Sequence, residues 1–158
     1  MRVRTISKFR CTKILLIASV LVLAGCKQET ASIVGNWTCQ SDLMGMDLQI
    51  TADYLADGSF KSVSKAQPAP NQPIVTATDT GTWKLEGDRL TILLTDVNWK
   101  FSGGSEAMRK RAETRFASSK PTILEQSNAH PTRTIRWNGR DEFSYSQESK
   151  TYTYRRQK

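Results

Sequence analysis

The chain has 158 residues, of which 23 are Lys or Arg and 15 are Asp or Glu, so its formal net charge is +8. Five of the basic residues and none of the acidic ones precede Ile14, and the 133 residues from Cys26 onward carry a net charge of only +3. That balance excludes the strongly basic surface typical of a nucleic-acid-binding protein, and we expect no nucleic-acid partner. The length suits one domain with a core of its own.

The first 25 residues have the composition of a targeting segment. Basic residues up to Lys13 precede an uncharged apolar run, Ile14–Leu23. Ten residues are too few to cross a bilayer core of about 30 Å as a helix. The arrangement is typical of a secretory signal peptide with a basic start and a cleavage site of small residues. If the cysteine that follows this segment is there by chance, the segment is an ordinary secretory signal or a short membrane anchor.

The segment ends in Leu23-Ala24-Gly25-Cys26, which resembles the lipobox of bacterial lipoproteins. The resemblance implies cleavage before Cys26, a lipid thioether on its sulfur and an acylated amino group, for example with palmitate. Several acyl chains on one residue give stable anchoring. Lys27 stands where an inner-membrane retention signal has aspartate, which implies the outer membrane of a Gram-negative cell, with the domain facing the periplasm. We expect a signal peptide at 1–25, a lipidated tether at 26–34 and a folded domain at 35–158.

Cysteine usage predicts a domain without internal disulfides. Cys11 leaves with the signal peptide and Cys26 is consumed by lipid, so Cys39 remains alone. It follows Trp37 by two residues and shares its strand face. We expect a buried thiol, and an intermolecular bridge is the alternative.

The rest of the chain has the patterning of antiparallel strands. Apolar and polar residues alternate from Met46 to Tyr54, as in a strand with one buried face. Turn signals follow at Asp57-Gly58, at Glu86-Gly87-Asp88 and at Asn138-Gly139. Three prolines between residues 66 and 73 predict a loop. Strands are expected near 36–40, 46–54, 59–65, 81–85, 90–94, 135–137, 143–145 and 152–154.

These elements predict an all-β fold, an antiparallel meander that closes into a roughly eight-stranded barrel. One helix is expected between strands, at about 105–118, with Ser105 as its N-cap and Pro121 limiting its end. Its apolar stripe is narrow, and basic residues surround it, so they form either a solvated face or a cationic patch for anionic lipid or an acidic partner. The stripe contains Met108, Ala112 and Phe116, and the basic residues are Arg109, Lys110, Arg111 and Arg115.

The segment Gly35-Asn36-Trp37 resembles the start of a lipocalin barrel. In that family the tryptophan closes the barrel floor and an arginine near the last strand lies against it, a role that Arg155 or Arg156 would take here. The hairpin that begins Gly81-Thr82-Trp83-Lys84-Leu85 is similar to the mid-barrel hairpin of lipocalin-like lipoproteins. A lipocalin's usual helix follows the barrel, so a helix between strands favours a lipocalin-like, or calycin-like, relative.

Aromatic residues are the candidates for a ligand site. They either line an apolar cavity or fill the barrel as a solid core. Those expected to line a cavity are Trp83, Trp99, Phe101, Trp137 and Tyr145. The segment around Trp99 and Phe101, next to Gly103-Gly104, is alternatively a mobile rim.

Catalytic and metal chemistry have little support in the sequence. His130 is the single histidine, and it has no Cys or Ser partner in a catalytic pattern. With one histidine and one unlipidated cysteine, a transition-metal site lacks its usual ligands. We therefore expect no catalytic residue, no metal and no cofactor, and a protein that is not an enzyme.

Three functions remain open. The first is a membrane-anchored periplasmic lipoprotein that binds a small apolar or amphipathic ligand in a lipocalin-like barrel. The alternative is a protein-binding module, such as a lysozyme-inhibitor or toxin-immunity lipoprotein, with the Pro-rich loop and the basic helix as its contact surface. An accessory role in envelope assembly is a third reading.

Overall fold

The computed structural model describes residues 31–158, except residues 44, 45 and 148. The expected signal peptide, the lipobox and Cys26 therefore lie outside the described residues. Within the described part, no helix is long and apolar enough to cross a bilayer. The chain forms eight strands and one helix: β1 (Gly35–Leu43), β2 (Met46–Tyr54), β3 (Ser59–Ala66), β4 (Ile74–Glu86), β5 (Arg89–Ser102), α1 (Glu106–Ala129), β6 (Thr132–Trp137), β7 (Glu142–Gln147) and β8 (Lys150–Arg156).

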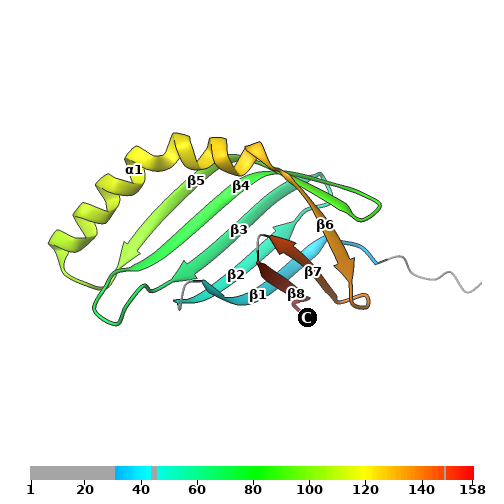
Figure 1. The fold of residues 1–158 in the computed structure, drawn as a ribbon, viewed down its shortest axis with the longest axis horizontal. Coiled ribbons are helices and arrows are strands. Elements are labelled where there is room, and N and C mark those ends of the chain that lie inside the picture. The colour runs from blue at the N-terminus through cyan, green and yellow to red at the C-terminus, as the bar shows by residue number, and fades with distance from the viewer. Residues whose placement is uncertain (1–30, 44–45, 148) are drawn as a thin grey trace, which may run out of the picture.

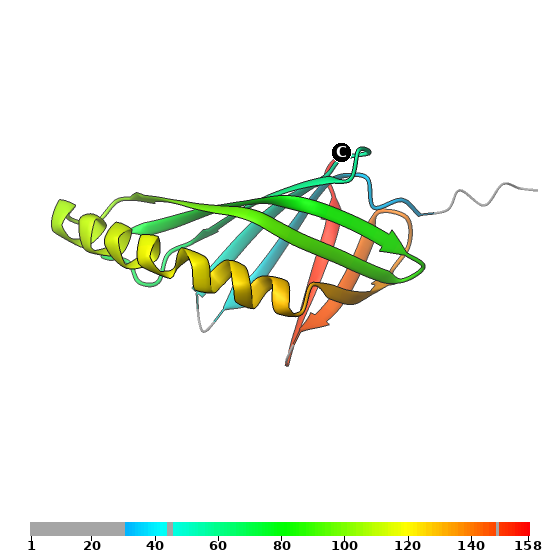
Figure 2. The ribbon, with the colours of Figure 1, turned by 90° about the horizontal axis from the view of Figure 1, so that it is seen from above.

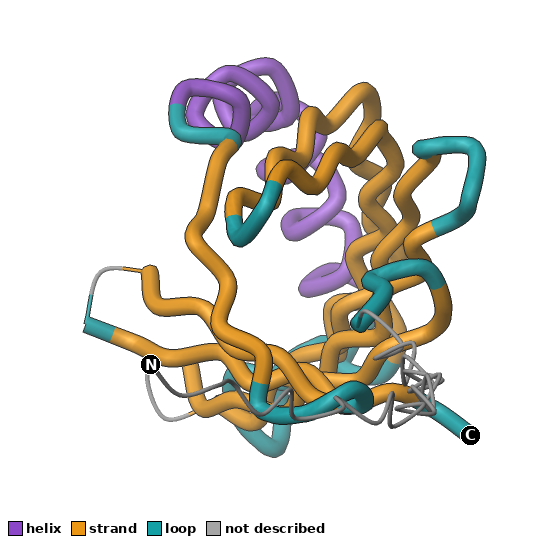
Figure 3. The backbone as a smooth tube through the Cα atoms, turned by 90° about the vertical axis from the view of Figure 1, so that its right-hand side faces the viewer, coloured by secondary structure: helices purple, strands orange, loops and turns teal. Residues whose placement is uncertain are grey.

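The strands form one closed barrel in which every strand pairs with its neighbours in the sequence and β8 returns to β1 (Figure 1). All pairs are antiparallel. The predicted meander barrel of about eight strands with one inserted helix is confirmed. Figure 3 shows the strands arranged as a ring with α1 on one side.

The alternation predicted for β2 sets which of its residues face the core. Ala52 and Tyr54 are buried, and Asp47, Gln49 and Thr51 on the other face are exposed. The turn that follows is formed as predicted: Asp57 Oδ1 accepts hydrogen bonds from the Ser59 backbone N–H (2.8 Å) and hydroxyl. An Asp side chain that bonds to the backbone two residues later stabilises such a turn.

The β4–β5 hairpin is much longer than the sequence predicted. The two strands pair from Glu86 and Arg89 at the turn to Ile74 and Ser102 at the far end. The register shifts beside Gly81, which is where an extra residue in β5 makes a bulge. The bulge interrupts the period-2 pattern, so the alternation that ends at Leu94 resumes one residue late, and the strand continues through Trp99 and Phe101. These residues, for which a mobile rim was the alternative, thus lie in a strand paired with β4.

Helix α1 begins as predicted, with the Ser105 hydroxyl accepting a hydrogen bond from the Met108 N–H (3.3 Å). Its predicted end is wrong, because the helix continues through Pro121 to Ala129. A proline removes one backbone hydrogen bond from a helix. Tertiary contacts beyond it hold the second half in place, and Pro121 is itself exposed to solvent.

The second half of α1 is fixed to the edge of β5. The side-chain amide of Asn128 accepts a hydrogen bond from the Leu94 N–H and donates one to the Leu94 carbonyl, both 2.9 Å long. Lys120 also forms an ion pair with Asp96 of β5. Since β5 pairs with β6 only over Arg89–Thr91, the Asn128 amide satisfies the Leu94 backbone groups on a part of the β5 edge that has no strand partner. Figure 2 shows α1 alongside β5.

The core lies in the half of the barrel near the β1–β8 closure. Its largest fully buried side chains are Trp37, Tyr54, Phe143, Ile33 and Leu90. The helix contributes no fully buried residue. Ile33 precedes the predicted start of the domain, so packing begins within the segment expected to be a tether.

Candidate functional site

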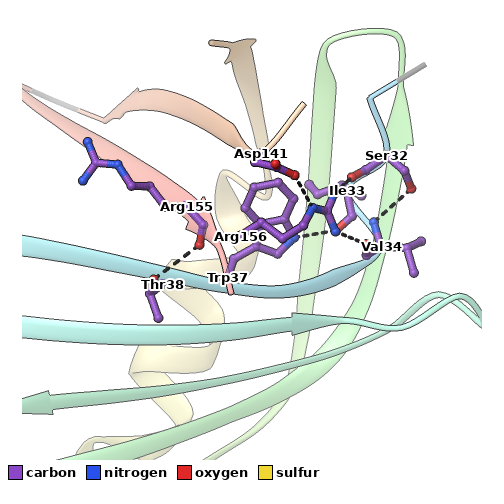
Figure 4. A network of polar contacts seen from close by, with 8 residues as sticks. All are labelled: Ser32, Ile33, Val34, Trp37, Thr38, Asp141, Arg155 and Arg156. Carbon is purple, nitrogen blue, oxygen red and sulfur yellow. Dashed lines mark hydrogen bonds and ion pairs between the residues drawn. The ribbon is translucent and has the colours of Figure 1, made fainter. Parts of the chain in front are cut away.

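The barrel floor is built around Trp37, whose side chain is 0% exposed. Its indole N–H donates to the Ile33 carbonyl at 2.7 Å. The Phe143 and Trp37 rings pack edge to face, with ring centroids 4.7 Å apart. The guanidinium of Arg156 lies 4.3 Å from the centre of the Trp37 ring (Figure 4), a favourable cation–π arrangement.

Arg156 also forms hydrogen bonds with the segment that precedes β1. Its guanidinium donates to the carbonyls of Val34 and Ser32 and pairs with Asp141 across 3.2 Å (Figure 4). Gly35 allows this approach, because a Cβ there would lie 2.4 Å from Arg156 Nη1 and its φ is +133°. The resemblance assigned this partnership to Arg155 or Arg156, and the structure selects Arg156.

Arg155 points to the outside of the barrel. Its side chain is 73% exposed and pairs with Glu142 across 2.8 Å. An exposed pair of this kind contributes about 0–1 kcal/mol. Arg155 therefore supplements the β7–β8 pairing and has no part in the floor.

Above the floor, the barrel interior contains a partly open cavity of about 260 Å³. Its walls are more polar than the sequence suggested. Aromatic and aliphatic residues alternate there with hydroxyls, an amide, an acid and an arginine. Among the lining residues are Ile50, Tyr54, Ser62, Ser64, Asp79, Ile92, Leu94, Arg133, Tyr145, Gln147, Tyr152 and Tyr154.

Tyrosines form one wall of the cavity. Tyr145 stacks on Tyr152 and Tyr154, with ring centroids 5.3 and 5.9 Å apart. A tyrosine hydroxyl is protonated at neutral pH, since its ordinary pKa is about 10, and burial raises the pKa of Tyr54 and of Tyr154 further. The Tyr154 and Tyr145 side chains share a hydrogen bond.

Arg133 brings a positive charge to the same wall. Its guanidinium lies 5.1 Å from the centre of the Tyr145 ring. Burial raises the pKa of Tyr145, and the charge of Arg133 partly opposes that rise. Among the described residues no ion pair joins Arg133 to a carboxylate. Its charge is therefore available to an anionic group inside the barrel.

Asp79 lies on the β4 wall of the cavity and accepts a hydrogen bond from the Ser62 hydroxyl at 3.0 Å. Burial raises its pKa, and this hydrogen bond opposes the rise only in part. The folded protein thus binds this proton more tightly than the unfolded chain does. The stabilisation of the folded state by protonated Asp79 is fully present below the ordinary Asp pKa of about 3.9. It is lost as the pH rises through the raised pKa of the folded state.

Asp79→Asn should therefore remove this loss of stability with increasing pH, because the amide never ionises. The check is the urea midpoint of unfolding, measured at a series of pH values from about 3.9 upward. Asp47→Asn, which removes an exposed carboxylate from β2, is the matched control. A slope in Asp79→Asn equal to that of the wild type would contradict the expectation.

The five aromatic residues predicted to line a ligand cavity divide among three places. Tyr145 lines the barrel cavity. Trp83 and Trp137 pack against the core near the floor, where the Trp83 indole donates to the Leu55 carbonyl at 2.9 Å. Trp99 and Phe101 instead contact Phe116 of α1, with ring centroids 5.4 and 5.3 Å apart.

The polar wall residues were not predicted from the sequence. Ser62 and Ser64 are the alternate residues of β3, and Asp79 stands opposite Ser62 in the register with β4. Their inward position could have been inferred from the period of two that begins at Phe60. The prediction of cavity-lining residues was based on the aromatic residues alone, so it did not include these polar ones.

Cys39 and His130 occupy contrasting positions. Cys39 is buried, as predicted, with 3% of its surface exposed, and burial raises the pKa of its thiol. A protonated thiol is a poor nucleophile. His130 is exposed and follows the last residue of α1. In the described part of the chain, no three His, Cys, Asp or Glu side chains cluster as metal ligands do.

The closed eight-stranded antiparallel barrel with one helix is consistent with a lipocalin-like fold. No protein-family model matches the chain, and no curated protein matches its sequence. The fold and the cavity are therefore the basis for a functional proposal.

Proposed function

We propose that this protein binds a small amphipathic molecule inside its barrel. The observation that carries the proposal is the partly open cavity of about 260 Å³ inside the barrel, which has both apolar and polar walls. This volume lies just below the roughly 300–1,000 Å³ of most ligand pockets, so the ligand is small. The polar wall favours an amphipathic ligand over a wholly apolar one.

The positive charge of Arg133 on the cavity wall indicates the chemistry of the ligand's polar group. Arg133 can bind a carboxylate or phosphate through two parallel hydrogen bonds. Tyrosine side chains, among them Tyr145 beside Arg133, line the same cavity. Ile50, Ile92 and Leu94 provide apolar contact for the remainder of the molecule.

Native mass spectrometry of the protein purified from producing cells tests this proposal. We expect a retained small anionic compound in the wild type and at least tenfold lower occupancy in Arg133→Leu, since a hydrogen bond to a charged group contributes about 1.5–3 kcal/mol. Arg136→Leu, on the exposed face of the same strand, is the matched control and should retain the compound.

The melting temperature is a second measurement, with octanoate, benzoate and phenyl phosphate as probes. No retained compound together with no shift for any probe would overturn the proposal. Capture of a single envelope protein by the same sample would then favour the protein-binding alternative.

We also propose that the protein is a lipoprotein held at the outer membrane through Cys26. The proposal rests on the Leu23-Ala24-Gly25-Cys26 match and on the basic and apolar segments before it. Cys26→Ser should abolish incorporation of labelled palmitate and release the protein from the membrane fraction. Cys11→Ser, within the predicted signal, should change neither readout. Labelling that survives in Cys26→Ser would contradict the assignment.

A further inference from the structure

A second hollow lies between the first half of α1 and the far end of the β4–β5 hairpin. Its volume is about 640 Å³, within the range of ligand pockets. The Pro-rich loop between β3 and β4 forms one end of it, and Figure 1 shows this loop beside the first turns of α1. We call this hollow the helix groove.

The helix groove has an apolar floor. Phe116 of α1 packs on Phe101 of β5, and Val75 and Ala112 continue the surface on either side. The end wall is closely packed, because a Cβ on Gly104 would lie 3.1 Å from the Pro73 ring. The apolar stripe predicted on α1 thus faces the hairpin without being fully buried by it.

Positive charge lies along one side of this floor. Arg111 and Arg115, one helical turn apart, both line the groove. Among the described residues neither forms an ion pair with a carboxylate. Arg109 differs, since its guanidinium donates to the carbonyls of Gly103 and Gly104 at 3.1 and 2.9 Å.

We propose that the helix groove binds a single-chain anionic amphiphile, taken up from solution as a monomer. The alkyl chain lies on the floor formed by Phe101, Phe116 and Val75. The anionic head contacts Arg111 and Arg115. This site is separate from the barrel cavity, and no residue lines both.

Isothermal titration with decanoate, below the concentration at which it forms micelles, tests the proposal. The chain from Lys27 onward contains every described element of the barrel and helix, and cooperative thermal unfolding is checked first for each variant. We expect saturable binding of decanoate and at least tenfold weaker binding of decyltrimethylammonium, which has an alkyl chain of similar length and the opposite charge.

Two pairs of variants locate the site. Ala112→Trp fills the floor and should weaken decanoate binding at least tenfold, whereas Ala117→Trp, on the exposed side of α1, should leave it unchanged. Arg111→Glu combined with Arg115→Glu should weaken it at least tenfold, and the exposed Lys110→Glu should change it less than twofold. If Ala112→Trp does not fold, Gln72→Trp in the loop fills the groove from the other side.

The outcomes separate this proposal from the barrel site. If decanoate binding survives Ala112→Trp but is lost in Arg133→Leu, decanoate binds in the barrel cavity, and the proposal is overturned. Equal affinity for the two head groups overturns it as well. Binding to anionic phosphatidylglycerol vesicles that depends on the arginines, without any binding of monomeric decanoate, would overturn it in favour of a membrane-facing surface.

Discussion

Replacing Trp37 with alanine is expected to lower the free energy of unfolding by about 3–5 kcal/mol, the usual cost of removing a large aromatic side chain from a core. The loss combines a cavity beside Phe143 with the hydrogen bond to Ile33 and the contact with Arg156. Since small domains have about 5–15 kcal/mol in total, the variant should be close to unfolding. Urea denaturation of the chain from Lys27 onward measures the change.

Two control variants show whether the barrel floor contributes more to the free energy of unfolding than other sites do. Trp99→Ala removes an aromatic of the same size that is only half-buried, and its effect should be smaller. Arg155→Ala removes an exposed arginine next to Arg156 and should change the free energy of unfolding by less than about 1 kcal/mol. A loss in Trp37→Ala no larger than in Trp99→Ala would show that the floor does not dominate stability.

Gly81→Ala is expected to destabilise the protein by about 3 kcal/mol, at the upper end of the range for overpacking. A Cβ at this position would lie 2.0 Å from the Leu93 carbonyl oxygen and 2.9 Å from the Leu94 Cα. Both atoms belong to the backbone of the paired strand, which cannot move aside as a flexible side chain can. The expected readouts are a lower melting temperature and faster hydrogen exchange of the amides around the β4–β5 bulge.

Gly87→Ala is the matched control for that substitution. Gly87 lies in the turn of the same hairpin, and a Cβ there would meet no atom within 4 Å, so only its left-handed backbone, φ +63°, resists the change. A cost of about 1–2 kcal/mol follows from that conformation. If Gly81→Ala were the milder of the two, the close approach at the bulge would not govern the hairpin.

The sequence predicted those parts of the fold that repeat with a simple period. Alternation in β2, together with the glycine turns, was sufficient to place most strands and to predict barrel closure. The pairing of Trp37 with an arginine followed from the lipocalin resemblance, and geometry then distinguished Arg156 from Arg155. Both arginines are adjacent in the sequence, so only the opposite directions of their side chains on β8 separate them.

The errors came from features that depend on contacts distant in the sequence. The bulge in β5 concealed the second half of the longest hairpin. Pro121 predicted the end of a helix that Asn128 and Lys120 hold against β5. The cavity wall was missed because Arg133 and Asp79 are charged, and a charged residue in a strand is ordinarily assumed to face water.

The closure between β1 and β8 joins the two ends of the folded chain. The Thr38 hydroxyl donates to the carbonyl of Arg155, which is 117 residues away. The pairs Trp37–Arg156, Thr38–Arg155 and Cys39–Tyr154 therefore form only after almost the whole barrel has been assembled. Closing so long a loop costs entropy before the contacts are gained, and proteins with such contacts fold slowly. We expect the free edge of β1 to persist until late in folding, with the indole of Trp37 solvent-exposed until the last strand arrives.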